Sequence, residues 1–366
     1  MTLIIFIIIL GLLVLVHELG HFLAAKKAGV RVDEFGFGYP PRALTLGEKW
    51  GTKFSLNWIP FGGFVKIFGE DYNAPQPPLN LRGGAEKRFT DVSKKWQAAI
   101  LAAGVIFNIL FAWVLFSVGF LVGLPAPVEN EFGMAVKDPS LTVISVLPQS
   151  PAETAGLKAG DKIVEVSSAS KKIQTPDPMV VSDFINNSSG TVKVGIDRGG
   201  KMLGFELLPQ PGLVDGKKII GVSMDMVGIL QLPLHRAVIE GARTTVEITY
   251  LTARGLVGLL VDAVRGNGDL SQVTGPVGIV GLVGDASRLG FTYLLTFTAL
   301  ISINLAIVNL IPIPALDGGR LLFVAIESIT RRPINPKIAS SLNMIGFALL
   351  LLLMIVITTK DILNLF

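Results

Sequence analysis

Four long apolar runs, nearly free of charged residues, constrain this chain more than any other feature of its sequence. Each is about as long as the roughly 20 residues that an α-helix needs to cross a bilayer. Half of the 366 residues are hydrophobic and only 16% are charged, which excludes a disordered chain and argues against an ordinary soluble domain. The runs are residues 3–25, Gln97–Val128, Leu289–Leu316 and Leu342–Thr359. The sequence therefore predicts a multi-pass α-helical membrane protein with about four transmembrane helices.

The basic residues between these runs predict the orientation of the chain. Lys26 and Lys27 follow the first run, whereas a cleaved signal peptide carries its basic residues before the apolar stretch. Residues 26–95 hold 12 basic and 7 acidic residues, and residues 126–240 hold 11 basic and 13 acidic ones. Because basic loops stay in the cytoplasm, we expect residues 26–95 there, and the N-terminus and residues 126–240 outside. The net charge of +4 is too small to suggest nucleic-acid binding.

Three further stretches do not read as membrane spans. Residues 31–68 alternate polar and apolar side chains, with turn signals at Gly47–Gly51 and Gly62-Gly63, which predicts a small antiparallel sheet that dips toward the membrane. Residues 234–264 show a helical apolar pattern interrupted by charges, which favours an interfacial helix. Gly266–Gly284 is rich in glycine and is expected to be irregular.

The first apolar run contains the pattern His17-Glu18-Leu19-Gly20-His21. On a helix, this spacing sets both imidazoles on one face, where they can bind one Zn²⁺ with the glutamate beside a coordinated water. The alternative is two core histidines and a glutamate that caps a helix. Three ionisable side chains within a membrane span are costly unless they pair or bind something, so the metal interpretation is favoured.

A catalytic zinc usually takes a third protein ligand and leaves one position for water. The chain has no cysteine, hence neither thiolate ligands nor disulfides. His235 lies in the region predicted to be outside, so a carboxylate is required. Asp317 follows the third apolar run and is the best candidate, although an Asp-Gly pair is also common in turns. At about 1.5 Å per residue, His17 lies some 20 Å along its helix from Leu3, toward the cytoplasmic end, and Asp317 is expected on the same side. Pro312 and Pro314 just before it free backbone carbonyls, which membrane proteins tolerate where the backbone lines a cavity.

Several separated motifs together resemble one known family. They are the zinc motif in the first run, the sequence Asn-x-x-Pro-x-Pro-x-Leu-Asp-Gly over residues 309–318, Phe35-Gly36-Phe37-Gly38 and Gly275-Pro276-Val277-Gly278. Along the chain these motifs occur in the order and topology of one family, and the chain is therefore similar to the site-2 protease family of intramembrane zinc metalloproteases, nearest its bacterial RseP-like branch. The resemblance implies His17, His21 and Asp317 as zinc ligands, Glu18 as catalytic base and Asn309 as a substrate-binding residue.

The resemblance also implies partners, a location and a pathway type. The substrates would be membrane proteins with transmembrane helices, such as anti-sigma factors or signal-peptide remnants, cleaved in regulated intramembrane proteolysis. The protein would lie in the bacterial inner membrane, with its active site toward the cytoplasmic side of the bilayer.

Residues 142–166 predict a strand, a short helix, a Gly-Asp turn and another strand, which is similar to a PDZ domain. We expect an extracytoplasmic PDZ-like α+β domain at 126–228, between a membrane core at 1–125 and another at 229–366. Some family members carry two tandem PDZ domains, whereas the space here fits one. Such a domain has a groove that binds an extended peptide as an added strand, or it only shields the site.

The predicted activity is hydrolysis of peptide bonds within or near transmembrane segments. Zinc would activate water and polarise the scissile carbonyl, and Glu18 would take the water's proton and pass it to the leaving amine. A substrate helix must first unwind locally, because its carbonyls are bonded internally in lipid, and the sheet at 31–68 could hold the unwound stretch. The alternatives are a membrane metal transporter and a non-catalytic PDZ-bearing scaffold. Against a transporter, the three ionisable residues lie at one point, and a scaffold would not need Glu18.

Overall fold

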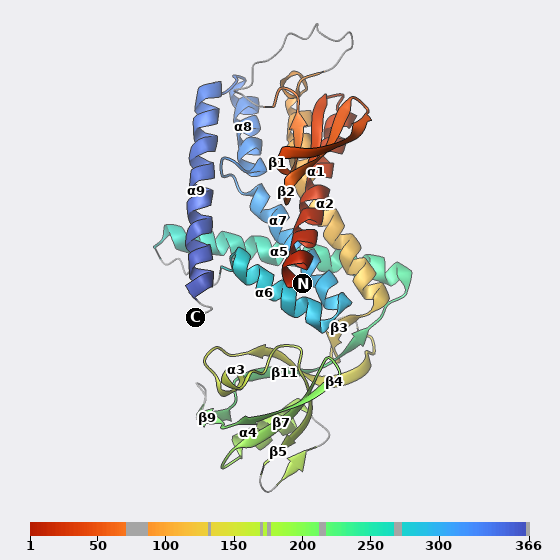
Figure 1. Cartoon of the computed structure of the whole chain (residues 1–366), viewed down its shortest axis with the longest axis vertical. Coiled ribbons are helices and arrows are strands. Elements are labelled where there is room, and N and C mark those ends of the chain that lie inside the picture. Colours follow the sequence, from red (N-terminus) through yellow and green to blue (C-terminus); the bar gives the residue numbers. More distant parts are fainter. Residues whose placement is uncertain are drawn as a thin grey trace. The chain divides into compact units, whose positions relative to one another are not determined.

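The computed structural model of this chain describes residues 1–70, 87–130, 133–168, 171–173, 177–211, 217–266 and 273–363, with only the backbone of Pro60, Phe61 and Val264. The chain divides into two compact units (Figure 1). Each unit buries its own clusters of apolar side chains. The first unit holds Met1–Ser117, Val238–Ser287 and Leu294–Phe366, and the second holds Val118–Ala237 and Arg288–Tyr293.

Four helices of the described chain are long and apolar enough to cross a membrane. They are α1 (Thr2–Lys27), α2 (Lys94–Val122), α7 (Phe291–Leu310) and α9 (Pro336–Leu363) (Figure 1). Each coincides with one of the four apolar runs, so the prediction of about four membrane-spanning helices is confirmed by length and composition. A 3-10 turn at Phe89–Asp91 precedes α2.

Three other helices belong wholly or partly to the first unit: α5 (Leu234–Val264), α6 (Pro276–Leu289) and α8 (Asp317–Thr330). The helix expected over residues 234–264 is present as α5. The motif around Asp317 does not lie within the third membrane helix, because α7 ends at Leu310 and Asp317 begins the separate helix α8.

The expectation of irregular structure for Gly266–Gly284 is wrong over residues 276–284, which are helical in α6, while residues 267–272 lie outside the described chain. Pro276 is the first residue of the helix, where the missing N–H of proline costs nothing. Asp361 of α9 accepts hydrogen bonds from the Gly275 and Gly278 backbone N–H groups, at 3.3 and 2.8 Å. A carboxylate from a distant segment thus caps this helix, and no local pattern predicts such a partner.

Strands β1 (Val32–Lys49) and β2 (Thr52–Ile67) pair as an antiparallel sheet, as the alternation in residues 31–68 predicts. Trp50 and Gly51 join them with φ angles of +55° and +68°, and two successive positive φ values are typical of a tight type I′ hairpin turn. Phe37 of β1 pairs with both Leu56 and Gly63 of β2, so β2 doubles back near Gly62, whose φ is +81°. Both predicted turn signals therefore lie at turns.

Three phenylalanine rings fasten this sheet to the first helix. Phe22 of α1 lies 5.5 Å from Phe35 and 5.9 Å from Phe54, measured between ring centroids, and Phe35 and Phe54 are 5.8 Å apart. Edge-to-face and tilted pairs at these distances are favourable beyond the burial of their surface. The sheet is therefore fixed beside the part of α1 that carries the zinc motif.

Glu34 crosslinks the sheet through charge-assisted hydrogen bonds. Arg42 donates to both of its carboxylate oxygens, at 2.8 and 2.7 Å, and the Ser55 hydroxyl donates at 2.6 Å. Partial burial acts to raise the pKa of the Glu34 carboxyl, but the bonds from Ser55 and Arg42 outweigh it, so this pKa lies below its ordinary value. The folded sheet thus favours the ionised glutamate.

The second unit is built on a seven-stranded sheet with the order β3-β11-β4-β5-β7-β8, in which β6 pairs with β5. Its strands are β3 (Leu124–Pro127), β4 (Lys137–Val146), β5 (Lys162–Ser167), β6 (Lys172–Ile173), β7 (Val192–Arg198), β8 (Lys201–Leu207) and β11 (Val222–Leu230). A separate pair is formed by β9 (Gln210–Pro211) and β10 (Lys218–Ile219). The chain enters through β3 and leaves through β11, and these two strands pair with each other.

Two short helices, α3 (Pro151–Ala155) and α4 (Pro178–Asn186), complete this unit. Ser150 caps α3 by accepting from the Glu153 N–H, and Asp177 caps α4 in the same way, with a proline first in each helix. The order strand, short helix, strand predicted for residues 142–166 is present as β4, α3 and β5.

Candidate metal centre

Helix α1 carries both histidines of the zinc motif on one face. His17 and His21 are one helical turn apart, and only 6% and 7% of their surfaces are exposed. Gly20 lies between them at a close crossing with α2, where a Cβ would come within 2.4 Å of the Ala103 carbonyl oxygen. The glycine inside the motif therefore lets α1 approach α2 closely and bury both imidazoles.

Asp317 is set in place by a break in the helical chain. After α7 ends, Ala315 has a φ of +80°, and α8 then begins at Asp317. A Cβ on Gly318 would lie 2.3 Å from the carbonyl oxygens of Leu310 and Ile311, so the first turn of α8 packs directly on the end of α7. The proline-containing break therefore turns the chain so that the aspartate stands at a helix start.

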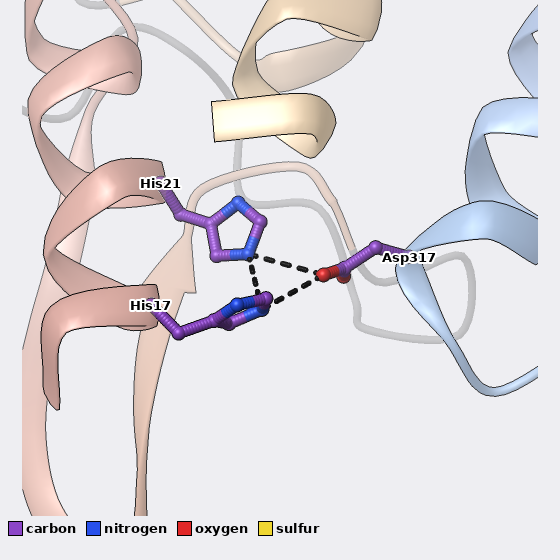
Figure 2. A group of neighbouring side chains, drawn as sticks. All are labelled: His17, His21 and Asp317. Carbon is purple, nitrogen blue, oxygen red and sulfur yellow. Dashed lines mark hydrogen bonds and ion pairs between the residues drawn. The ribbon is translucent and has the colours of Figure 1, made fainter. Parts of the chain in front are cut away.

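The structure brings His17, His21 and Asp317 together, although 300 residues separate the first from the last. Figure 2 shows the three side chains pointing toward one another, the imidazoles from α1 and the carboxylate from α8. The Asp317 Oδ2 atom lies 2.9 Å from His17 Nε2 and 3.3 Å from His21 Nε2, and the two nitrogens are 3.1 Å apart.

These separations can be compared with those of a zinc site. When tetrahedral zinc binds nitrogen and oxygen at about 2.0–2.1 Å, neighbouring ligand atoms lie about 3.3 Å apart. The three measured separations, 2.9, 3.1 and 3.3 Å, are close to that value. Two imidazoles and one carboxylate are also a donor set that zinc accepts in catalytic sites. The residues present therefore fit a zinc ion.

Helix α2 forms one wall of this cluster, which the sequence analysis did not foresee. The His21 Nδ1 atom donates to the Ile100 carbonyl oxygen at 2.8 Å, and since a carbonyl can only accept, the Nε2 atom of the neutral ring is left with its lone pair toward the cluster. One turn further, a Cβ on Gly104 would lie 2.4 Å from His21 Nε2 and 2.7 Å from His17 Nε2. Only glycine at position 104 leaves room for these histidine nitrogens.

Glu18 lies next to the cluster on the side of the sheet. Its carboxyl interacts electrostatically with His21 and Asp317 and is hydrogen-bonded to the backbone of Val65 in β2. Gly63 of the same strand is also close, because a Cβ there would meet the Glu18 side chain at 3.6 Å. The glutamate is therefore between the histidine pair and an extended strand.

A second acidic residue near the cluster, Glu70, was also missed. It follows β2 and forms an ion pair with Arg320 in the first turn of α8. Burial raises the pKa of the Glu70 carboxyl, and the positive charge of Arg320 opposes this shift. The pair ties the end of the sheet to the helix that begins at Asp317, and 250 residues separate its partners, so no sequence spacing could have found it.

Asn309, the remaining predicted site residue, is not part of the cluster of His17, His21 and Asp317. It lies half-buried in the last turn of α7, and the structure describes no hydrogen bond from its side chain to another described residue. Its position, eight residues before Asp317, places it at the start of the non-helical break.

Comparison with known proteins gives matches over nearly the whole chain. A model of Peptidase family M50 matches residues 5–353. A protein of Clostridium acetobutylicum described as a candidate zinc metalloprotease is 33% identical over 362 residues, which cover 99% of this chain and 97% of the relative. Zinc metalloprotease RasP of Geobacillus kaustophilus is 28% identical over 430 residues, covering 98% and 96%. Regulator of sigma-E protease RseP of Escherichia coli is 28% identical over 441 residues, covering 95% of each protein.

Proposed function

The chain belongs to peptidase family M50, the site-2 proteases, and from this premise we propose that His17, His21 and Asp317 hold its zinc while Glu18 is the catalytic base. The protein is an intramembrane zinc metalloprotease, as its family and its relatives RasP and RseP indicate. This membership decides against the metal transporter and the non-catalytic scaffold.

The single observation that carries the assignment of ligands is the convergence of three buried donor atoms. The donors are one nitrogen each of His17 and His21 and one carboxylate oxygen of Asp317. These three atoms lie within 4.8 Å of one another, so the described residues bring together a group that can hold one ion. Burying two imidazoles and a carboxylate in an apolar helix bundle is costly unless they share a cation.

Hydrolysis adds OH to the carbonyl carbon of the scissile bond and a proton to the leaving nitrogen. Zinc, when bound, supplies a Lewis acid that polarises the carbonyl and lowers the pKa of water. Glu18 takes the proton released by the attacking water and then passes it to the amine. Its place between the histidine pair and strand β2 suits transfer in both directions.

Substrate binding is proposed to use the sheet and Asn309. A transmembrane helix must unwind before its peptide bond can reach the ligand cluster, and the freed N–H and C=O groups then need partners. The β1/β2 sheet lies beside Glu18 and can provide them by strand addition. Asn309, whose amide has no partner among the described residues, can donate to a substrate carbonyl.

The remaining proposals concern the second unit, the orientation and the substrates. Residues 126–228 are proposed as a single extracytoplasmic PDZ-like domain, flanked by membrane cores at 1–125 and 229–366, which either binds peptides in a groove or shields the site. The alignment to RasP runs over 430 positions, more than the 366 residues of this chain, which supports a smaller insertion here. The excess of basic residues in 26–95 supports an inner-membrane protein with its N-terminus outside and its site toward the cytoplasm.

Membrane proteins with transmembrane helices are the proposed substrates, cleaved in regulated intramembrane proteolysis. RseP is named for its regulation of sigma-E, which supports anti-sigma factors as one substrate class. Signal-peptide remnants, which are short apolar helices, are the other.

The test uses the full chain in detergent, a transmembrane peptide substrate and two variants. Glu18→Gln is expected to keep zinc and to lose cleavage by about 10²–10⁴-fold, and Asp317→Asn is expected to lose zinc. Asp225→Asn, at an exposed carboxylate of β11, is the matched control and should change neither. Turnover by Glu18→Gln at the unmodified rate would remove Glu18 from the role of base, and unchanged zinc content in Asp317→Asn would remove Asp317 from the ligand set.

A further inference from the structure

Asn108 of α2 is a buried polar residue in contact with the candidate metal centre that the mechanism above does not use. None of its surface is exposed, and its carboxamide nitrogen lies 3.3 Å from His17 Nδ1. Its carboxamide oxygen is buried and has no hydrogen-bond partner among the described residues. A buried acceptor without a donor is unfavourable, so this oxygen needs an explanation.

The explanation lies in what a zinc ligand requires of His17. A neutral imidazole carries one N–H, and if Nε2 gives its lone pair to a metal, the proton must be on Nδ1. That N–H then needs an acceptor, since a ligating histidine almost always donates its other nitrogen to a neighbouring group. Asn108 is the residue within reach of His17 Nδ1 in the described structure.

A half-turn of the carboxamide exchanges its nitrogen and oxygen within nearly the same volume. The oxygen without a partner then accepts from His17 Nδ1–H, and Nε2 of His17 faces Asp317 and His21 with its lone pair free. His21 is already held in this manner, because its Nδ1 donates to the Ile100 carbonyl oxygen at 2.8 Å. The two ligands would therefore be oriented in the same way, by two acceptors on one helix.

The spacing on α2 supports this arrangement. Ile100, Gly104 and Asn108 follow one another at intervals of four residues and thus share one helix face. The first holds His21, the second leaves space for the ligand atoms, and the third contacts His17. The Asn108 backbone is itself held, because the buried Ser302 hydroxyl of α7 donates to its carbonyl oxygen at 2.8 Å.

We propose that Asn108 is a positioning residue of the metal centre: its carboxamide oxygen accepts from His17 Nδ1–H and so holds His17 in the tautomer and ring orientation that zinc needs. This inference rests on the proposed ligand set of His17, His21 and Asp317. It makes α2, which supplies no ligand, the helix that orients both histidines.

The test measures zinc affinity of the full chain in detergent by competition with a chromophoric chelator, which requires no cleavage assay. Asn108→Leu keeps the size of the side chain but removes the acceptor, and it is expected to weaken zinc binding by about 10–100-fold. Asn108→Asp keeps an acceptor at the same place, because an ionised carboxylate accepts hydrogen bonds and donates none. Its zinc affinity should therefore stay within about threefold of that of the unmodified protein. Ser117→Ala, which removes a buried hydroxyl of α2 that donates to the Trp113 carbonyl oxygen of the same helix, is the control and should not change the affinity.

Two outcomes would overturn the role of Asn108. One is unmodified zinc affinity in Asn108→Leu. The other is equal weakening by Asn108→Leu and Asn108→Asp, which would mean that the amide N–H₂ or packing matters instead of an acceptor. If Asn108→Leu does not fold, the zinc affinity of Asn108→Asp decides whether an acceptor at position 108 is sufficient. The Co²⁺-substituted form of Asn108→Asp should then keep the absorption spectrum of the Co²⁺-substituted unmodified protein. Asp317→Asn is measured beside them: zinc retained in that variant defeats the ligand assignment, whereas zinc lost there and kept in Asn108→Leu defeats only the present inference.

Discussion

Replacing Gly104 by alanine tests whether α2 shapes the metal centre. An added Cβ would lie 2.4 Å from His21 Nε2 and 2.7 Å from both Cε1 and Nε2 of His17. Ordinary van der Waals contact begins at 3.4 Å, so the His21 ring would have to move by about 1 Å. Metal–ligand distances tolerate only about 0.2 Å. The same methyl group would also occupy space next to the ligand atoms.

The expected result is a large loss of zinc from a protein that still folds. Because removing outer contacts of a ligand already costs about 10–100-fold in affinity, displacing a ligand atom should cost at least about 100-fold, or roughly 2.7 kcal/mol. Alanine is favoured over glycine in a helix interior by about 1 kcal/mol, so weakening of α2 cannot account for the loss. Zinc content after purification and chelator competition measure the effect, and thermal unfolding of the metal-free protein reports the fold.

Gly281→Ala is the matched control, because Gly281 lies in the interior of α6 and a Cβ there would meet nothing within 4 Å. It should bind zinc as the unmodified protein does. The reasoning is refuted if Gly104→Ala binds zinc with the same affinity as Gly281→Ala, because the ligand atoms would then not lie where a Cβ at position 104 can reach them.

Three further substitutions test how the surroundings are held. Asp361→Asn removes the charge at the start of α6 and should lower stability by about 1 kcal/mol in thermal unfolding; a loss no larger than that of an exposed Asp→Asn change would contradict the capping role. Glu34→Gln should lower the free energy of unfolding by up to about 1 kcal/mol at pH 7. The pKa of Glu34 is lowered in the folded protein, so its stabilising effect is present above the ordinary glutamate pKa and is lost as the pH falls through the lowered value. Equal effects of this variant at pH 7 and at about pH 3 would refute the pair with Arg42. Gly318→Ala would place a Cβ 2.3 Å from the Leu310 carbonyl oxygen. Because this backbone atom cannot move away easily, Asp317 should shift and zinc should be lost. A normal zinc content would show that the turn has room for the methyl group.

Local patterns were sufficient for much of the site. A helix places residues four apart on one face whatever surrounds it, so His17 and His21 could be paired from their spacing alone. Asp317, the proposed third ligand, was reached by elimination, since the chain has no cysteine and few carboxylates near its apolar runs. The hairpin turns were also readable, because glycine marks positions of positive φ at Gly51 and Gly62.

Other parts of the site could not be predicted because their chemistry has no local signature. Ile100 contributes its backbone carbonyl, which every residue possesses, and Gly104 contributes space because it has no Cβ. Helix α6 was expected to be irregular because its segment is rich in glycine, and the residue that caps it, Asp361, comes from another helix. In each case the partner is chosen by packing between segments far apart in the chain.

By itself, the sequence determined that the chain has four apolar runs long enough to span a membrane and that one of them, as a helix, carries two imidazoles on a single face. Run length and helical period are properties of a segment alone. Only the tertiary structure decided that Asp317 meets those imidazoles and that α2 lies against them with a glycine, a carbonyl and the Asn108 amide. The physical reason is that apolar helix faces resemble one another in sequence, and their packing alone selects which polar atoms they bring together.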